Sequence, residues 1–142
     1  MQDAVFLFPG QGSQYTGMGK DFYDNFQVVR DLFAEGSEVT GMNLKHLCFE
    51  EPDEILMQTE NVQPAITLIN VATFLVLKKN GIIPSATAGH SLGEYASLYA
   101  AGVIKFSDLM KLVQARGLFM KEAAADNPGG MVMPMGMSVE AM

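Results

Sequence analysis

The sequence predicts an α/β domain, because short apolar runs typical of buried strands alternate with longer helical patterns along its 142 residues. The residues AVFLF at 4–8 form a continuous apolar run that Pro9 stops, which predicts a strand buried on both faces, as in a parallel sheet. A second run, IIPSATA at 82–88, leads into Gly89 and predicts a short or broken strand. So few strands among so many helices predict that more of the sheet follows.

Helical or amphipathic patterns occupy six segments: 19–35, 43–49, 52–58, 64–81, 92–101 and 107–125. Gly36 is expected to end the first of these. Pro64 is expected in the first turn of the fourth, which is apolar nearly all round and should therefore be central. Ser107 is a good N-cap for the last helix. The segment DNPGG at 126–130 reads as a linker, after which Pro134 interrupts what would otherwise be a strand.

Composition excludes several classes of protein. Hydrophobic residues make up 49% and charged residues 18% of the chain, which is typical of a soluble globular domain. No run approaches the roughly 18 consecutive apolar residues of a membrane span, and no secretory signal is recognisable, so a cytoplasmic protein is expected. The net charge of -7 disfavours nucleic acid as a partner. The single cysteine, Cys48, cannot form an internal disulfide and is expected to be a small buried apolar side chain.

Ser91 lies between two glycines in GHSLG, at the junction of the second predicted strand and the helix after it. One interpretation is a helix cap, in which Glu94 completes a capping box. The other is a nucleophile elbow, in which a tight strand-to-helix turn exposes the serine hydroxyl and the helix N-terminus offers backbone N–H groups to an oxyanion. The spacing alone leaves both interpretations open.

Two further features allow both a functional and a structural interpretation. The glycine cluster FPGQGSQ directly follows the first strand, where loops of α/β enzymes line active sites, but a plain turn is the simpler interpretation. Arg116 shares the apolar stripe of the last helix with Leu109, Leu112, Val113 and Met120. A guanidinium there needs an anion, either an internal carboxylate or the carboxylate of a substrate.

The chain has two histidines, and neither is placed to be the base that a serine nucleophile needs. His90 is expected to pack or hydrogen-bond beneath the turn, and His46 to lie at the surface or to pack. In serine enzymes with this elbow the base follows the nucleophile along the chain, and no histidine follows Ser91.

Several motifs in order, FPGQGSQYTGMG, VQPAI, AGHSLGEYASLYAAGVI and ARGLFMKEA, resemble those of the malonyl-CoA:acyl-carrier-protein transacylase family and of the related acyltransferase domains of polyketide synthases. The resemblance implies an α/β-hydrolase-like large subdomain and a ferredoxin-like small subdomain. It also implies transfer of a malonyl group from malonyl-CoA to the phosphopantetheine thiol of acyl carrier protein through an acyl-serine, in fatty-acid biosynthesis, with no cofactor or metal.

The same resemblance implies the roles of individual residues. Ser91 would be the nucleophile, and the backbone N–H groups of Gln11 and Leu92 would form the oxyanion hole.

Three further residues would bind the substrate. Arg116 would hold the malonyl carboxylate, and Gln63 and His90 would be its neighbours in the pocket. The preference for malonyl over methylmalonyl or another acyl group stays open, as does the choice between fatty-acid and polyketide synthesis.

The chain departs from the family by stopping early. Residues 1–126 would form the N-terminal part of the large subdomain, and residues 127–142 the linker and the beginning of the small one. The family's catalytic histidine would lie further on, so these 142 residues alone are expected to be inactive. Two other functions stay open: a serine hydrolase or thioesterase with the same elbow, and a non-catalytic fragment that binds the carrier protein.

Overall fold

The computed structural model describes residues 4–130 and residue 136. Two strands and seven helices lie within that part of the chain. They are β1 (Ala4–Phe8), α1 (Lys20–Asn25), α2 (Gln27–Thr40), α3 (Leu44–Phe49), α4 (Asp53–Leu56), α5 (Thr59–Lys79), β2 (Pro84–Gly89), α6 (Gly93–Ala100) and α7 (Phe106–Asp126). This order confirms the predicted α/β class.

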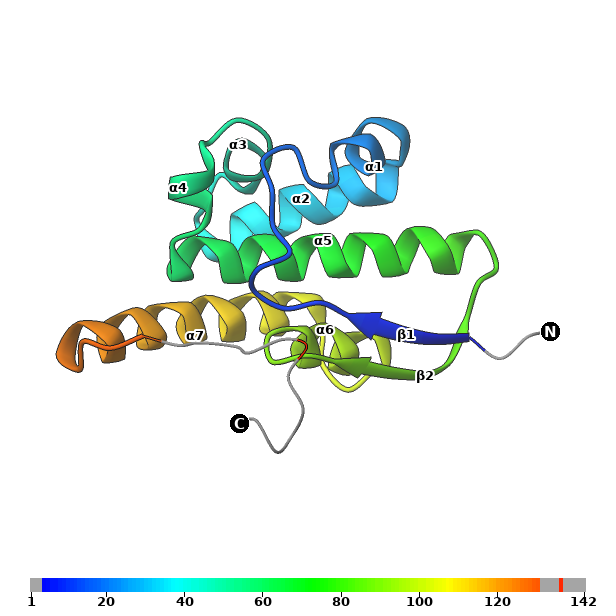
Figure 1. Ribbon diagram of the computed structural model, residues 1–142. Helices are drawn as coiled ribbons and strands as arrows, with labels where there is room; N and C mark the ends of the chain where they lie inside the picture. Colours follow the sequence, from blue (N-terminus) through cyan, green and yellow to red (C-terminus); the bar gives the residue numbers. More distant parts are fainter. Residues whose placement is uncertain (1–3, 131–135, 137–142) are drawn as a thin grey trace.

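The long helix α5 lies at the centre, between α1–α4 on one side and α6, α7 and the sheet on the other (Figure 1). Its buried residues lie on every side of the helix, as its nearly continuous apolar sequence predicts. By length and composition α5 could also cross a membrane, but 67% of its most apolar stretch is buried inside the protein. The packing identifies it as the core helix.

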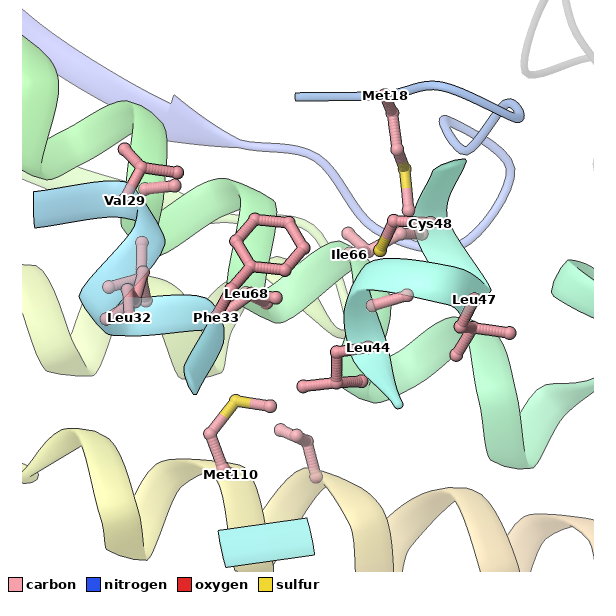
Figure 2. Close-up of a cluster of buried hydrophobic side chains, with 14 of the residues drawn as sticks. Met18, Val29, Leu32, Phe33, Leu44, Leu47, Cys48, Ile66, Leu68 and Met110 are labelled. Carbon is pink, nitrogen blue, oxygen red and sulfur yellow. The ribbon is translucent and has the colours of Figure 1, made fainter. Parts of the chain in front are cut away.

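The main hydrophobic core forms where α2, α3 and α7 pack against α5. Figure 2 shows Phe33 of α2, Leu44 of α3 and Met110 of α7 gathered around Leu68 of α5. Gly36 belongs to this contact: a Cβ there would lie 3.1 Å from Leu44 and 3.4 Å from Leu68. The prediction that Gly36 ends a helix is therefore wrong, because the glycine is needed for close packing inside α2.

Other helix boundaries also differ from the predicted ones. The segment 19–35 is not one helix, because Phe26 takes an extended conformation (φ -125°, ψ 119°) that separates α1 from α2. α5 begins at Thr59, five residues before Pro64. α7 begins at Phe106 without a side-chain cap, so Ser107 is not its N-cap.

The two strands pair in parallel, with Phe8 opposite Gly89. Phe6 and Phe8 face the helices, and the Phe6 ring packs edge-on against Phe74 of α5 at a centroid distance of 6.2 Å. Leu7 points the other way and is 75% exposed. In the described part of the chain β1 is therefore buried on one face, and the prediction of two buried faces is wrong.

Cys48 is fully buried in the core, as predicted. Burial raises the pKa of its thiol to about 12, because the thiolate would lose its hydration. Residues 127–130 form neither helix nor strand, whereas Asp126, the first residue of the predicted linker, still belongs to α7. The predicted interrupted strand around Pro134 lies outside the described residues.

Candidate active site

Parallel pairing brings the carboxyl ends of β1 and β2 to the same edge of the sheet, and Ser91 lies there. It occupies the turn between β2 and α6, with a left-handed backbone (φ 51°). The N-cap residue of α6 is Leu92, and no side chain caps the helix. The capping box of Ser91 and Glu94 is therefore not formed, and the geometry is that of an elbow with an exposed serine.

Both glycines of GHSLG are required by close backbone contacts. A Cβ at Gly89 would lie 2.1 Å from the carbonyl carbon of Gly93. A Cβ at Gly93 would lie 2.0 Å from the carbonyl oxygen of Phe8. The first turn of α6 thus packs directly against the ends of both strands, and this contact fixes the elbow.

The glycine segment after β1 passes next to the elbow. A Cβ at Gly10 would lie 2.6 Å from the carbonyl oxygen of His90 and 3.6 Å from the backbone nitrogen of Leu92. Gln11 follows directly, so both predicted oxyanion donors belong to segments that touch. Within residues 4–130, neither the N–H of Gln11 nor that of Leu92 donates a hydrogen bond to another protein atom.

Arg116 of α7 joins the serine to α5. Its Nη2 donates to Ser91 Oγ (3.2 Å), and its Nη1 donates to Gln63 Oε1 (2.7 Å). Gln63 is fully buried, and its Nε2 also donates to the sulfur of Met120 (3.0 Å). Three of the predicted site residues are therefore brought together from the elbow, α5 and α7. In the described part of the chain no carboxylate pairs with Arg116, so no internal acidic partner is found there.

The sequence analysis missed Tyr95, which lies on the first turn of α6. The Arg116 guanidinium carbon is 5.5 Å from the centre of the Tyr95 ring, a distance at which the cation is attracted to the ring. The two residues are 21 positions apart, so no local pattern links them. The signal that could have found the pair is an aromatic residue one turn after a serine elbow.

The crossing of α7 over α5 explains how Arg116 reaches its partners. Gly117 makes the crossing close, since a Cβ there would lie 3.0 Å from the carbonyl oxygen of Thr59. Beyond it, Lys121 pairs with Glu60 at 2.5 Å, and this hydrogen bond lowers the pKa of the Glu60 carboxyl.

The predicted apolar stripe of α7 is only half correct. Leu109 and Val113 are buried, but Leu112 is 43% and Met120 38% exposed. Arg116 lies at the edge of the buried face of α7, where its guanidinium can reach the serine.

The two histidines take different positions. His90 is exposed and donates its backbone N–H to the carbonyl of Phe8 (3.1 Å), so the prediction that it packs beneath the turn is wrong. His46 lies at the surface, as predicted, with its ring nitrogens 2.9 Å from Glu50 and 3.1 Å from Glu51. The hydrogen bond to Glu50 raises the pKa of His46. Within residues 4–130, no imidazole is hydrogen-bonded to Ser91 Oγ.

A hollow of about 440 Å³ lies beside the elbow and is lined by Leu7, Phe8, Pro9, Ala88, Gly89 and His90. A second hollow, of about 450 Å³, runs along β1 and α5, and neither Ser91 nor Arg116 lines it. Neither Ser91 nor Arg116 lines the first hollow either, so the candidate site is defined by the contacts around the elbow and not by a hollow.

An elbow serine with helix N–H groups behind it is typical of α/β enzymes that work through an acyl-serine, and the comparison with known families agrees. Residues 5–139 match the acyl transferase domain family, so the chain belongs to it. The chain is 44% identical over 142 residues to the malonyl CoA-acyl carrier protein transacylase of Bacillus subtilis (strain 168), covering 100% of this chain and 45% of that protein. The chain thus spans less than half the length of this relative.

Solved structures give the same result. The crystal structure of malonyl CoA-acyl carrier protein transacylase from Clostridium perfringens matches with a TM-score of 0.82 at 46% identity, over 86% of this chain and 39% of that one. The complex of a type II polyketide-synthase acyl-carrier protein with its malonyl-transacylase matches with a TM-score of 0.82 at 45% identity, over 86% of this chain and 40% of that one. The α/β fold is therefore that of these transacylases.

Proposed function

We propose that this chain supplies the nucleophile and the carboxylate-binding arginine of a malonyl-CoA:acyl-carrier-protein transacylase. The single observation that carries the proposal is the hydrogen bond from Arg116 to Ser91 Oγ, because it places a fixed cation beside the nucleophile. A thioesterase for uncharged acyl groups would have no use for that cation. The similarity to transacylases from several bacteria supports the same function.

The reaction follows from these groups. Ser91 Oγ attacks the thioester carbonyl of malonyl-CoA, and its proton passes to a base. The tetrahedral intermediate collapses with cleavage of the C–S bond, and the coenzyme A thiol leaves with a proton. In the second half, the phosphopantetheine thiol of acyl carrier protein attacks the malonyl ester, and Ser91 is released with its proton restored.

Charge is stabilised at both ends of the acyl group. The N–H groups of Gln11 and Leu92 would receive the oxyanion, for which they are suited because neither is engaged elsewhere in the described residues. Arg116 would bind the malonyl carboxylate in a bidentate pair. Gln63 would hold the guanidinium in place for this contact through its 2.7 Å hydrogen bond, and His90 would border the substrate.

We also propose to which subdomains the chain belongs and where in the cell the enzyme works. Residues 1–126 would belong to an α/β-hydrolase-like large subdomain, and residues 127–142 to a linker and the start of a ferredoxin-like small subdomain. The chemistry needs no cofactor beyond the substrate malonyl-CoA. We place the enzyme in the cytoplasm, in fatty-acid biosynthesis, with acyl carrier protein as its partner.

Malonylation of the protein tests the function. The full protein is incubated with malonyl-CoA, digested and analysed by mass spectrometry, and the adduct is expected on the peptide that contains Ser91. Addition of holo acyl carrier protein should discharge the adduct to malonyl-carrier protein rather than to free malonate. An adduct on another residue that persists in Ser91→Ala, or release of malonate alone, would contradict the proposal.

A further inference from the structure

The segment 9–17, which carries Gln11, has no helix or strand to hold it. An oxyanion donor is effective only when it is fixed before the reaction, because then no reorganisation is needed as charge develops. Side chains from two helices, α4 and α5, hydrogen-bond this segment and bear on how the Gln11 amide is placed.

Asn70 of α5 holds the start of segment 9–17. Its Nδ2 donates to the carbonyl oxygen of Pro9 at 3.0 Å. Asn70 is only 6% exposed and lies in an otherwise apolar stretch of helix, where an amide costs free energy unless it is hydrogen-bonded. The same Pro9 oxygen would lie 2.9 Å from a Cβ at Gly93, so the peptide that joins Pro9 to Gly10 is enclosed between α5 and α6.

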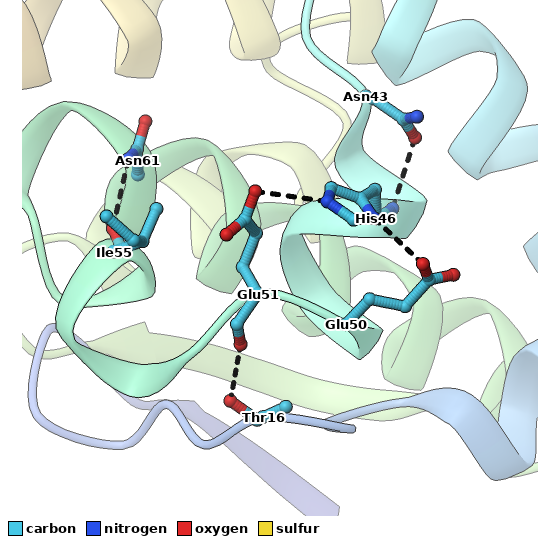
Figure 3. Close-up of polar contacts among 7 residues, drawn as sticks. All are labelled: Thr16, Asn43, His46, Glu50, Glu51, Ile55 and Asn61. Atoms are coloured by element: carbon cyan, nitrogen blue, oxygen red, sulfur yellow. Dashed lines mark hydrogen bonds and ion pairs between the residues drawn. The ribbon is translucent and has the colours of Figure 1, made fainter.

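Thr16 holds the far end of segment 9–17 against the connection between α3 and α4 (Figure 3). Its backbone N–H donates to Asp53 Oδ1 at 3.0 Å. Its hydroxyl lies 2.7 Å from the same oxygen and 2.9 Å from the carbonyl oxygen of Glu51, and it can donate to one of them at a time. The next residue, Gly17, donates its N–H to the carbonyl of Cys48 at 2.7 Å.

Short hydrogen bonds stiffen the interior of segment 9–17. Ser13 Oγ donates to the carbonyl of Gly10 at 2.9 Å, and the N–H of Gly12 donates to Gln14 Oε1 at 2.8 Å. The amide of Gln11 lies between these contacts and makes none of its own within the described residues.

We propose that Asn70 and Asp53 are positioning residues for the oxyanion hole, which they hold by fixing the two ends of the segment that carries Gln11. This inference rests on the proposed function, since Gln11 matters only if Ser91 is acylated. Neither residue is among those proposed to contact the substrate. Because a displacement of about 1 Å in a catalytic group can cost about a hundredfold in rate, release of one end is expected to slow acylation without weakening substrate binding.

Two substitutions release the ends separately. Asn70→Leu removes the donor and keeps the same branched shape, and Asp53→Ala removes the acceptor at an exposed position. Each is expected to lower kcat about tenfold, to leave the KM for malonyl-CoA within about twofold, and to keep the preference for malonyl over acetyl. Asp53→Asn keeps an acceptor oxygen for the Thr16 amide and should restore most of kcat.

Matched controls lie on the same helices. Thr73→Ala removes a side-chain hydrogen bond from α5 that reaches only the carbonyl of Ile69 in the same helix. Glu54→Ala removes an exposed carboxylate next to Asp53 on α4. Both controls should leave kcat unchanged.

Hydrogen exchange of peptides covering 9–17 supplies a second measurement that does not depend on turnover. Exchange should become faster in Asn70→Leu and Asp53→Ala and stay unchanged in the controls. Unchanged kcat in Asp53→Ala, or a fall in kcat that the controls share, would overturn the inference. If the wild-type protein forms no malonyl-Ser91, the proposed function fails, whereas hydrogen exchange still decides whether Asn70 and Asp53 hold the segment.

Discussion

Arg116 donates hydrogen bonds to two neutral oxygen atoms, those of Gln63 and Ser91, so neither partner balances its positive charge. A carboxylate that replaces the Ser91 contact would supply the balance. Arg116→Ala should therefore weaken malonyl transfer by about 2–5 kcal/mol, while acetyl transfer is spared. Arg116→Lys keeps the charge but loses the bidentate geometry, and it should recover only part of the malonyl activity.

The measurement is kcat/KM for malonyl-CoA and acetyl-CoA in each variant. Lys111→Ala, an exposed cation on the same helix, is the control for a general loss of positive charge. Equal losses for the two acyl groups in Arg116→Ala would show that the guanidinium has only a structural role.

Among single residues, Ser91 and Arg116 could be identified from the sequence alone, because a serine or an arginine in these surroundings has few possible roles. A serine between two glycines and an arginine near an apolar stripe stand out locally, and the structure brings Ser91 and Arg116 together. Their shared neighbour Tyr95 could not be predicted, because its contact depends on the angle at which α7 crosses the rest of the molecule. The position of the His90 side chain could not be predicted either, since adjacent residues of a tight turn point in different directions.

The elements meet most tightly where α6 begins. Gly93→Ala would bring a methyl group within 2.0 Å of the Phe8 carbonyl, which is backbone and cannot move alone. Overpacking of this kind typically costs about 1–3 kcal/mol, so unfolding in urea should occur at a lower midpoint, and acylation of Ser91 should be largely lost. Gly130→Ala meets open space and is the control. A Gly93→Ala protein with wild-type stability would contradict the described contact.

Helices were predicted where they occur, and the bounds of α3, α6 and α7 were predicted to within one residue. The break between α1 and α2, the end of α2 and the start of α5 were not predicted. The break between α1 and α2 is hidden because Phe22 and Phe26 both fit one continuous helical period, although Phe26 leaves the helix. Gly36 reads as a terminator, and only the side chains of Leu44 and Leu68 from other helices explain why it lies inside α2. Boundaries set by tertiary packing are invisible to local patterns.

For the molecule as a whole, Cys48 reports on the core built around α5. Its thiol is fully buried and has a pKa raised to about 12, so it can react only when the core opens. Labelling with iodoacetamide should be about a thousandfold or more slower in native buffer than in urea, as followed by intact mass. Because Cys48 is the only cysteine, each addition reports this one site. Rapid labelling in native buffer would contradict a closed core.

The central place of α5 was predictable, since a helix that is apolar nearly all round must be covered on every side. The environment of β1 was not. Val5 and Leu7 have the composition of buried strand residues, yet in the described part of the chain the helices cover only the opposite face. The sequence of a strand shows how apolar each of its faces is, but it does not show which helix or strand covers that face.

The left-handed backbone of Ser91 also has a consequence for stability. A residue with a Cβ in that region is strained by about 1 kcal/mol or more relative to glycine, so the site trades conformational stability for an exposed hydroxyl. Ser91→Gly and Ser91→Ala both lose the hydroxyl and its bond from Arg116. They differ in this strain, which glycine relieves, and in the larger backbone entropy that glycine loses on folding, which opposes that gain. The glycine variant should therefore melt a few degrees above the alanine variant. Equal Tm values would mean that the backbone at position 91 is not strained in the alanine variant by more than this entropy offsets. A higher Tm for the glycine variant would show that the backbone conformation that exposes the Ser91 hydroxyl lowers the stability of the fold.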